Sequence, residues 1–466
     1  MRESRPNVTL AVLASAGLAY AVLSSAVVPA LPTIKDSLHA SEAGVTWLLT
    51  GYLLSASVGT AIIGRLGDMY GKERMLLWTL VVLAAGTLLA GLSHTLALLI
   101  VARVIQGVAG GIFPLAFGIV RDEFPRERVA GSIGFLSATL GIGAGVGIVA
   151  GAVIVEHLSW QWIFWMPLGV IVLSAIGTWR FIPESPVRVP GRINWTAATL
   201  MSVGMTCVLL AVTETTAWGW TSTRTVSLLV AGVIVSAAWV MVEMRSKEPL
   251  IDMTMMRIRG VWTTNLTAFL LGAGMYASFI VFPQFAQLPT STGFGYGASP
   301  VESGLYLLPS TAGMFLVGFA AGWIARRFGS KPAVVAGSVV TAMSFAFITF
   351  AHDHPYDMLI STAMLGVGIG LAFAALGNLI VEAVPPHQTG AAGGMNTVMR
   401  TIGGALGGQL AATFIAAHVR GGEPTVTGFT DTFAMATGFL VLCTLGAMLI
   451  PHGRPAPRRQ LAVATD

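Results

Sequence analysis

The sequence has few charged residues and few cysteines. Only 10% of its 466 residues are Asp, Glu, Lys or Arg, and the two cysteines are Cys207 and Cys443. Both cysteines lie inside apolar runs, so we expect neither a disulfide framework nor a cysteine metal site. The eight histidines lie outside the centres of these runs, and we predict no metal and no cofactor. Because no nucleophile with a matching base is evident, an enzyme is the least expected class.

Apolar residues are in excess instead. They make up 55% of the chain, and the mean hydropathy is +0.77. A soluble core does not need that much apolar surface. Helices of roughly 20 apolar residues cross a bilayer, whereas barrel strands are shorter and alternate in polarity. The sequence therefore predicts an all-α integral membrane protein.

The apolar runs predict fourteen transmembrane helices. The first run follows a short basic start and is too long for the core of a signal peptide, so we expect it to remain as a span. The predicted spans are 8–34, 42–63, 75–93, 96–120, 130–155, 160–182, 195–214, 224–243, 260–284, 302–325, 332–351, 357–382, 390–416 and 430–450.

The basic residues predict the orientation, because cytoplasmic loops carry an excess of Lys and Arg. With the N-terminus inside, all but five of the 26 Lys and Arg residues fall in inner segments. The exceptions are Lys35, Arg224 and Arg420 outside, and Arg103 and Arg400 within spans. We expect a multi-pass protein of the plasma (inner) membrane with both termini cytoplasmic. The net charge of +5 then reflects orientation, and no nucleic-acid partner is expected.

The two ends of the chain resemble each other. GRLGDMYGKER (64–74) aligns with GWIARRFGSKP (322–332) at an offset of 258, and the segments that start at Gly107 and Gly366 align at 259. Gly134 and Gly394 continue the match at 260. A nearly constant offset indicates an internal repeat. We predict two six-helix bundles in parallel repeat, 1–182 and 260–466 with its cytoplasmic tail, joined by a linker, 183–259, with two inserted helices.

These segments resemble a known family. GRLGDMYGKER resembles the signature between helices 2 and 3 of the major facilitator superfamily, and LLIVARVIQGVAGG (98–111) resembles its helix 4 signature. With fourteen predicted helices and SWQWIFWMPLG after helix 5, the chain resembles the fourteen-span drug/proton antiporter branch. It departs from that branch at Ile148, where Pro is expected, at Ala152, where Gly is expected, and at Leu23, where Asp is usual. These departures weigh against proton antiport and leave the fold unchanged.

The first signature predicts a latch on the inner side. Gly64 and Gly71 can allow a tight turn, and Asp68 can accept hydrogen bonds from a helix N-terminus or pair with Arg74. A simple positive-inside anchor is the alternative for Arg65 and Lys72. The resemblance implies a network of Gly64, Asp68, Gly71, Lys72 and Arg74 with Asp122 or Glu123. Arg326 replaces Asp68 in the second copy, so we predict an asymmetric latch.

Two arginines lie inside predicted spans, where an ionised side chain costs about 3 kcal/mol or more. The resemblance assigns Arg103, with Gln106 of the same signature, to proton coupling and substrate binding. Arg400 could bind an anionic or polar part of the substrate. For both arginines the alternative is a structural side chain bonded to backbone carbonyls. No Asp or Glu lies at the centre of a predicted span, so the proton carrier is not evident.

Gly143, Gly147 and Gly151 recur every four residues and therefore share one helix face. They could form a sliding or leak-preventing surface between the two halves, as the resemblance implies for this helix. Plain close packing against another helix is the alternative.

The substrate cavity should be lined by polar and aromatic side chains that face the bundle interior. The candidates are Tyr20, Tyr52, Tyr276, Gln284, Tyr306, Asn378 and Asn396. We predict a secondary active exporter of small hydrophobic or amphipathic compounds that works by alternating access, with protons and membrane lipids as further partners. A transporter of one specific metabolite, or a receptor-like or structural membrane protein that transports nothing, remains open.

Overall fold

The structure is a computed structural model that describes residues 6–185, 194–246, 248–420 and 423–451. Part of the predicted linker, 186–193, and the predicted cytoplasmic tail, 452–466, lie outside the described residues. The described residues form helices almost throughout. Two short strands, β1 (Val419–Arg420) and β2 (Glu423–Pro424), pair antiparallel between the last two long helices.

The helices fall into two halves and an insertion. The first half contains α1 (Pro6–Ser25), α2 (Leu31–Ser37), α3 (Glu42–Tyr70), α4 (Lys72–Gly91), α5 (Leu96–Gly107), η1 (Val108–Gly111), α6 (Ile112–Glu123), α7 (Arg126–His157) and α8 (Trp162–Phe181). The insertion contains α9 (Trp195–Thr213), α10 (Thr215–Trp218), α11 (Thr223–Arg245) and α12 (Met253–Met256). The second half contains α13 (Arg259–Gln287), η2 (Thr290–Thr292), α14 (Pro300–Leu305), α15 (Leu308–Phe328), α16 (Ser330–Phe350), α17 (Pro355–Ala383), η3 (Pro386–Gln388), α18 (Thr389–Ala417) and α19 (Val426–Leu449).

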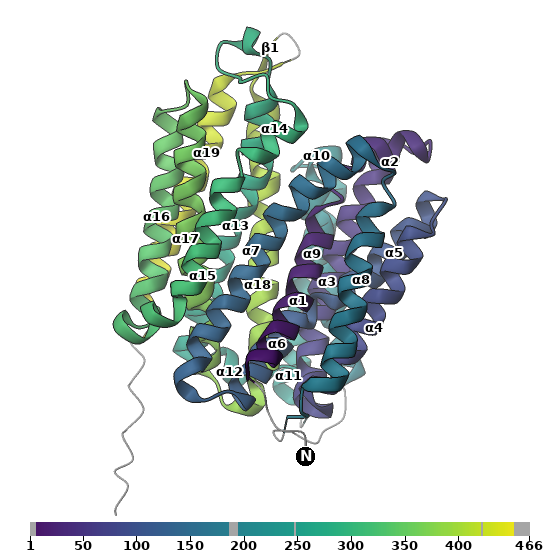
Figure 1. Cartoon of the computed structure of the whole chain (residues 1–466), viewed down its shortest axis with the longest axis vertical. Helices are drawn as coiled ribbons and strands as arrows, with labels where there is room; N and C mark the ends of the chain where they lie inside the picture. Colours follow the sequence, from purple (N-terminus) through teal and green to yellow (C-terminus); the bar gives the residue numbers. More distant parts are fainter. Residues whose placement is uncertain (1–5, 186–193, 247, 421–422, 452–466) are drawn as a thin grey trace, which may run out of the picture.

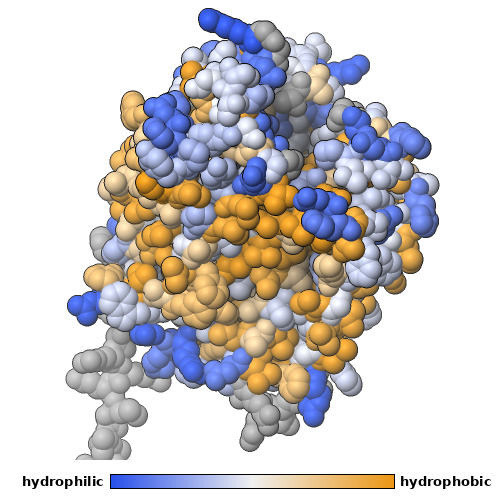
Figure 2. All heavy atoms as spheres, turned by 45° about the horizontal axis from the view of Figure 1, so that its top comes forward, coloured by the Kyte–Doolittle hydropathy of each residue, from blue (hydrophilic) through white to orange (hydrophobic). Residues whose placement is uncertain are grey.

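The number of membrane-crossing helices is consistent with the predicted fourteen. Within the described ranges, thirteen helical stretches are long and apolar enough to cross a membrane. The remaining long helix, α18, has 29 residues and one charged side chain, but its many glycines lower its hydropathy. We count α18 as the fourteenth span because it packs between α3 and α13 in the interior of the molecule. In Figure 2, apolar side chains gather over the middle of the visible face and hydrophilic ones lie toward its ends.

The two halves repeat the same packing. In the first half α1 packs on α7, and α4 packs on α8; in the second α13 packs on α18, and α16 packs on α19. Figure 1 shows the two bundles side by side, purple to blue and green to yellow. The chain thus folds as two six-helix bundles in parallel repeat with two inserted membrane helices, α9 and α11. The exact domain boundaries remain a proposal.

The bundles meet along two seams that are equivalent under the repeat, α3 with α18 and α7 with α15. Small residues let the backbones approach: a Cβ added at Gly322 would lie 2.8 Å from the Cα of Gly131. The inserted α9 packs on both α3 and α18. Trp220, just after α10, donates a hydrogen bond to Thr413 of α18 (2.8 Å). The insertion therefore covers the α3–α18 seam.

One end of the molecule holds the junction of α3 with α4, and we call it the latch end; it is the lower end in Figure 1. Only Gly71 separates these helices, and its φ of +107° is a conformation that favours glycine. Gly64 does not form the predicted turn, because α3 continues past it to Tyr70. A Cβ at Gly64 would collide with the carbonyl of Gly390, so this glycine permits close approach of the bundles. Where α19 ends, Pro451 lies beside Gly260, so both described chain ends are at the latch end.

Candidate latch and central polar site

The latch is built on the carboxylate of Asp68, at the end of α3. The side chain is fully buried. Its two oxygens accept hydrogen bonds from the backbone N–H groups of Gly390 (3.2 Å) and Ala391 (3.0 Å). These two residues begin α18, so the negative charge lies at the positive end of a helix dipole. The contact joins the first bundle to the second.

Lys72, in the first turn of α4, neutralises this buried charge. Its Nζ lies 2.7 Å from Oδ2 of Asp122 and 3.7 Å from Oδ1 of Asp68, and all three side chains are almost completely buried. Buried charges need such partners, because desolvation otherwise outweighs their attraction. A solvated positive-inside anchor does not describe Lys72. Asp122, rather than Glu123, is its partner on α6.

Arg74 lies outside this network. Its side chain is 60% exposed and is 4.0 Å from a carboxylate oxygen of Glu184. The alternative of an Asp68–Arg74 pair is therefore wrong. The α18 N-terminus is the partner that the structure gives to Asp68.

Arg121 is a second connection between the bundles that sequence reasoning missed. Its guanidinium donates hydrogen bonds to Thr389 Oγ1 (2.7 Å) and to the carbonyl of Val384 (2.8 Å). Both acceptors lie in the second bundle, where α17 leads into α18. Arg121 directly precedes the predicted Asp122, but nothing in its local sequence points to partners more than 260 residues away.

Further contacts close the latch end where α7 meets α15 and α17. Asn378, predicted to line the cavity, donates from Nδ2 to the carbonyl of Ala130 (3.2 Å). Arg326, the residue that replaces Asp68 in the repeat, donates to the carbonyl of Glu127 (3.4 Å). The second seam thus holds an arginine where the first holds a carboxylate, as the asymmetric alignment leads one to expect.

Asp252, at the N-cap of α12, ties the insertion to the same region. Gln388, just before α18, donates a hydrogen bond to its Oδ2 (3.1 Å). Burial acts to raise the pKa of the Asp252 carboxyl, but the hydrogen bonds from Thr254 and Gln388 outweigh it and hold this pKa below its usual value. Asp252 therefore stays ionised as an acceptor.

A second group of polar side chains lies at the centre of the molecule, around Arg103. This side chain has no exposed surface. Nε donates to the carbonyl of Leu48 (3.1 Å), and Nη1 donates to the carbonyl of Leu23 (3.3 Å) and to Gln106 Oε1 (2.9 Å). Gln106 in turn donates to Thr87 (3.2 Å). Arg103 thus has the carbonyl contacts of a structural arginine, and its Nη2 has no partner among the described residues.

Aromatic rings from the first bundle surround this arginine. The guanidinium carbon of Arg103 lies 4.1 Å from the centre of the Tyr52 ring, a cation–π distance. The ring centres of Tyr20 and Tyr52 are 6.1 Å apart, and Phe113 lies 6.3 Å from Tyr20. The Tyr52 hydroxyl is buried without a hydrogen-bond partner in the described part of the chain.

The second bundle contributes Tyr276 and Arg400 to the same region. Tyr276 lines a small cavity together with Thr50 and Leu53 of α3, and the charge of Arg400 acts on the Tyr20 phenol across the same boundary between the bundles. The Arg400 guanidinium carbon lies 4.6 Å from the centre of the Phe373 ring. The Tyr276 and Tyr20 phenols lie within the range of the Arg400 charge. We call Tyr20, Tyr52, Arg103, Tyr276 and Arg400 the central site.

Four predicted cavity residues lie elsewhere. Gln284 is exposed near the end of α13, and Tyr306 packs beside Tyr296 with ring centres 5.8 Å apart. Asn396 joins α18 to α13 through a hydrogen bond to Asn265 (3.1 Å). These side chains, like Asn378, do not join the central site. The residue types show that these side chains are polar, but the sequence does not show which helix each one faces.

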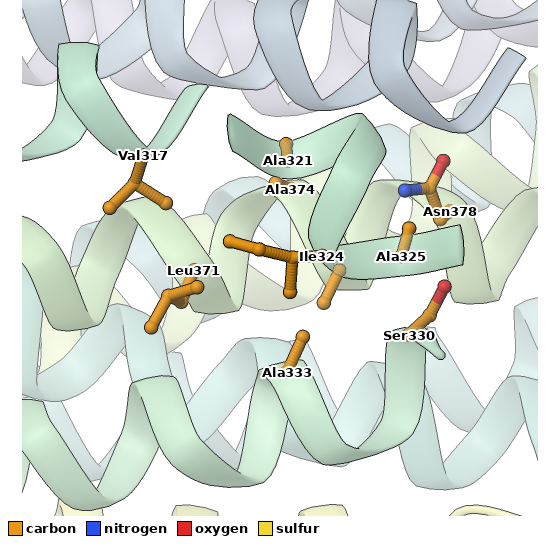
Figure 3. Close-up of a pocket in the computed structure, with 10 residues that line it drawn as sticks. Val317, Ala321, Ile324, Ala325, Ser330, Ala333, Leu371, Ala374 and Asn378 are labelled. Atoms are coloured by element: carbon orange, nitrogen blue, oxygen red, sulfur yellow. The ribbon is translucent and has the colours of Figure 1, made fainter. Parts of the chain in front are cut away.

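A small cavity lies inside the second bundle, where Asn378 and Ser330 stand at one end among apolar side chains (Figure 3). Its volume is about 10 Å³, which admits one water molecule at most. It is therefore not a substrate site.

The glycine ladder of α7 contacts α1. A Cβ at Gly143 would lie 3.0 Å from the carbonyl oxygen of Leu18, and one at Gly147 would lie 2.6 Å from that of Val22. Gly151 meets Ala26 in the same way. The prediction of a surface between the two halves is wrong for these residues, because α1 belongs to the same bundle. The face of α7 toward α15 carries other glycines.

Comparison with known proteins decides the family. The model of the Major Facilitator Superfamily matches residues 13–408. The chain belongs to the major facilitator superfamily. Within it, the chain is 32% identical over 427 residues to the tetracenomycin C resistance and export protein of Streptomyces glaucescens, covering 90% of this chain and 77% of that protein. It is 26% identical to multidrug resistance protein 3 of Bacillus subtilis (strain 168), covering 78% of this chain and 70% of the relative.

Solved structures of this superfamily share the fold. The human organic anion transporter MFSD10 superimposes with a TM-score of 0.67 at 15% identity, covering 95% of this chain and 100% of that one. The proton:xylose symporter XylE superimposes with a TM-score of 0.68 at 13% identity, covering 96% of each chain. The similarity to drug-export relatives agrees with the branch that the sequence motifs resemble.

Proposed function

We propose that this protein exports small amphipathic compounds across the plasma membrane by proton antiport, rather than catalysing a reaction. The central site carries the proposal, because side chains of both bundles meet there above a latch that is closed. A midplane site between two parallel repeats is the geometry of alternating access. The export and multidrug-resistance functions named for its relatives support the same direction of transport.

The charge distribution supports a cytoplasmic latch end, with both termini on that side. In that orientation the structure is closed toward the cytoplasm by Asp68 and Arg121. Closure on this side is what outward release requires, because alternating access keeps one side closed while the other opens. Breaking these contacts would open the central site to the cytoplasm and let a new substrate enter.

The central site suits compounds with aromatic rings and an acidic or hydrogen-bond-accepting group. The rings of Tyr20 and Tyr52 offer stacking surfaces, and the two N–H groups on Nη2 of Arg103 have no partner among the described residues. Arg400 of the second bundle adds a second positive charge to the central site. Guanidinium groups bind carboxylates and phenolates through charge-assisted hydrogen bonds. Sugars or other uniformly polar solutes would leave the aromatic faces unused.

Proton coupling needs a group that changes its charge within the cycle. The central site holds no carboxylate, whereas Asp68 is buried in the contact between the bundles. Protonation of Asp68 would remove the charge that faces the α18 N-terminus and would weaken the latch. We therefore propose Asp68 as the coupling acid, with Lys72 and Asp122 as its electrostatic partners.

Transport in proteoliposomes tests this proposal. Purified protein is reconstituted in liposomes with an imposed pH gradient, and fluorescent aromatic compounds with acidic, neutral or basic groups are followed. We expect movement of the acidic and neutral compounds that a protonophore abolishes, and no movement with Arg103→Ala. Transport of one metabolite alone would favour a specific transporter. No movement of any compound by well-folded protein would favour the receptor-like or structural alternative.

A further inference from the structure

A groove with a volume of about 370 Å³ lies at the latch end of the α7–α15 seam. The start of α1, the start of α7 and the end of α15 line it. Its polar side chains include Arg128 and Arg326, and its apolar ones include Phe135, Phe319 and Trp323. The groove is separate from the central site and from Asp68, and no transport step described above uses it.

The repeat shows what distinguishes this seam from the other one. Arg326 aligns with Asp68 at the offset of 258, and each lies against the first turn of a long helix of the opposite bundle. Asp68 supplies a negative charge to the start of α18, but Arg326 brings a positive charge to the start of α7. Its bond to the carbonyl of Glu127 is long at 3.4 Å.

The charge at this position is therefore unbalanced. Arg128 adds a second guanidinium and donates to Asn7 (3.2 Å). Pro125, the N-cap of α7, provides no side-chain cap, so the positive end of this helix adds to the two arginines. The Glu127 carboxylate is the acidic group in the first turn of α7, and its side chain is exposed to solvent. An anion would complete the site.

The wall of the groove requires an apolar ligand as well. Phe319 is 63% exposed and Trp323 is 54% exposed, on the face of α15 that a membrane would cover. Phe135 of α7 packs against Phe319 with ring centres 5.4 Å apart. Free phosphate would leave these rings uncovered, and a zwitterionic lipid would bring a cation toward the arginines. An anionic phospholipid satisfies both parts of the groove.

We propose that this groove binds one anionic phospholipid of the cytoplasmic leaflet, with its phosphate between Arg128 and Arg326 and an acyl chain along Phe135, Phe319 and Trp323. The leaflet follows from the proposed orientation. Because Arg128 belongs to the first bundle and Arg326 to the second, the lipid bridges the bundles and stabilises the closed latch end. The inserted α9 covers the other seam, so the bridge forms on one side only.

Native mass spectrometry of the purified full-length protein tests the proposal. The protein is titrated with palmitoyl-oleoyl phosphatidylglycerol and with phosphatidylcholine of the same acyl chains. We expect one tightly retained phosphatidylglycerol and at least about tenfold weaker retention of phosphatidylcholine. The double variant Arg128→Gln/Arg326→Gln should lose this preference. Arg245→Gln/Arg257→Gln, which removes the same charge from exposed positions outside the groove, should keep it.

Two further arms keep the result interpretable. Arg128→Lys/Arg326→Lys retains both charges and should restore most of the preference for phosphatidylglycerol, which separates charge from folding. Inorganic phosphate should not displace the lipid; displacement at millimolar phosphate would show a simple anion site and overturn the proposal. Equal retention of both lipids by wild type, or unchanged preference in the glutamine variant, would overturn it too. None of these outcomes depends on which compound is exported.

Discussion

The carboxylate of Asp68 lies 3.0 Å from the backbone nitrogen of Ala391, a residue that follows it by 323 positions. This contact places the acid of the first repeat on the helix start of the second. It is favourable because the helix dipole and two N–H groups face one buried charge. A charge-assisted hydrogen bond to a buried group contributes about 1.5–3 kcal/mol. Contacts of this size can decide which side of a transporter is open.

Asp68→Asn should weaken the latch and shift the protein toward the state open to the cytoplasm. The amide presents one donor-bearing nitrogen to the two N–H groups and removes one of the two negative charges that Lys72 faces, the other being Asp122. A loss of about 1.5–3 kcal/mol corresponds to roughly a tenfold to hundredfold shift of the equilibrium. Labelling of Ser137→Cys by a maleimide reports this shift, since Ser137 is buried at the contact of α7 with α17.

The labelling is measured in a background with Cys207→Ala and Cys443→Ser. Asp36→Asn, at the opposite end of the molecule, serves as the matched change and should leave the labelling rate unaltered. An unchanged rate in Asp68→Asn would show that the contact does not hold the latch.

Arg103→Ala should abolish export and also lower thermal stability. The carbonyls of Leu48 and Leu23 and the amide oxygen of Gln106 would each lose a hydrogen bond from a charged donor, and such a bond contributes about 1.5–3 kcal/mol. Arg103→Lys retains the charge but cannot reach three acceptors at once, so we expect correct insertion with at least about tenfold slower export. Export in proteoliposomes and the melting temperature are measured together. Wild-type export by correctly inserted Arg103→Ala would remove it from the transport machinery.

Arg400→Gln should discriminate between substrates. If Arg400 binds an acidic group, export of an acidic aromatic compound should fall about tenfold, while a neutral compound of the same scaffold should change less than about twofold. Arg224→Gln, near the start of α11, is the matched loss of charge. An equal fall for both compounds would indicate that Arg400 supports packing over Phe373 instead.

The sequence could predict the fold because two of its signals are physical constraints. A membrane admits only spans of sufficient apolar length, and the constant offset shows that the two halves carry the same helices. We did not predict the break between α1 and α2 within the span 8–34, although Pro29 and Pro32 lie at this break. The sequence did not predict the extension of α3 to Tyr70, because hydropathy indicates which residues lie in the membrane and not where a helix ends.

The site could be predicted only in part. An arginine buried in a membrane span requires partners. Arg103 and Arg400 could therefore be predicted as site residues from their positions inside predicted spans. The neighbours of a side chain depend on the orientation of its helix about the helix axis, which the sequence does not specify. In the structure Gln284 is exposed, and Asn396 faces α13. Arg121 was missed because its acceptors lie in a distant segment.

The glycine ladder allows a sharp test of packing against gating. The spacing of four residues predicts that the glycines share one face of α7, but it does not predict which helix packs on that face. In the structure that helix is α1. Gly147→Ala would place a Cβ 2.6 Å from the carbonyl oxygen of Val22 and still closer to Ser25, and backbone atoms cannot move aside cheaply. We expect a loss of about 1–3 kcal/mol in stability, seen as a lower melting temperature and lower expression. Gly169→Ala on α8 has no atom within 4 Å of the new Cβ, so its stability should stay the same or rise slightly. Normal stability of Gly147→Ala with impaired export would instead assign the ladder a role in the transport cycle.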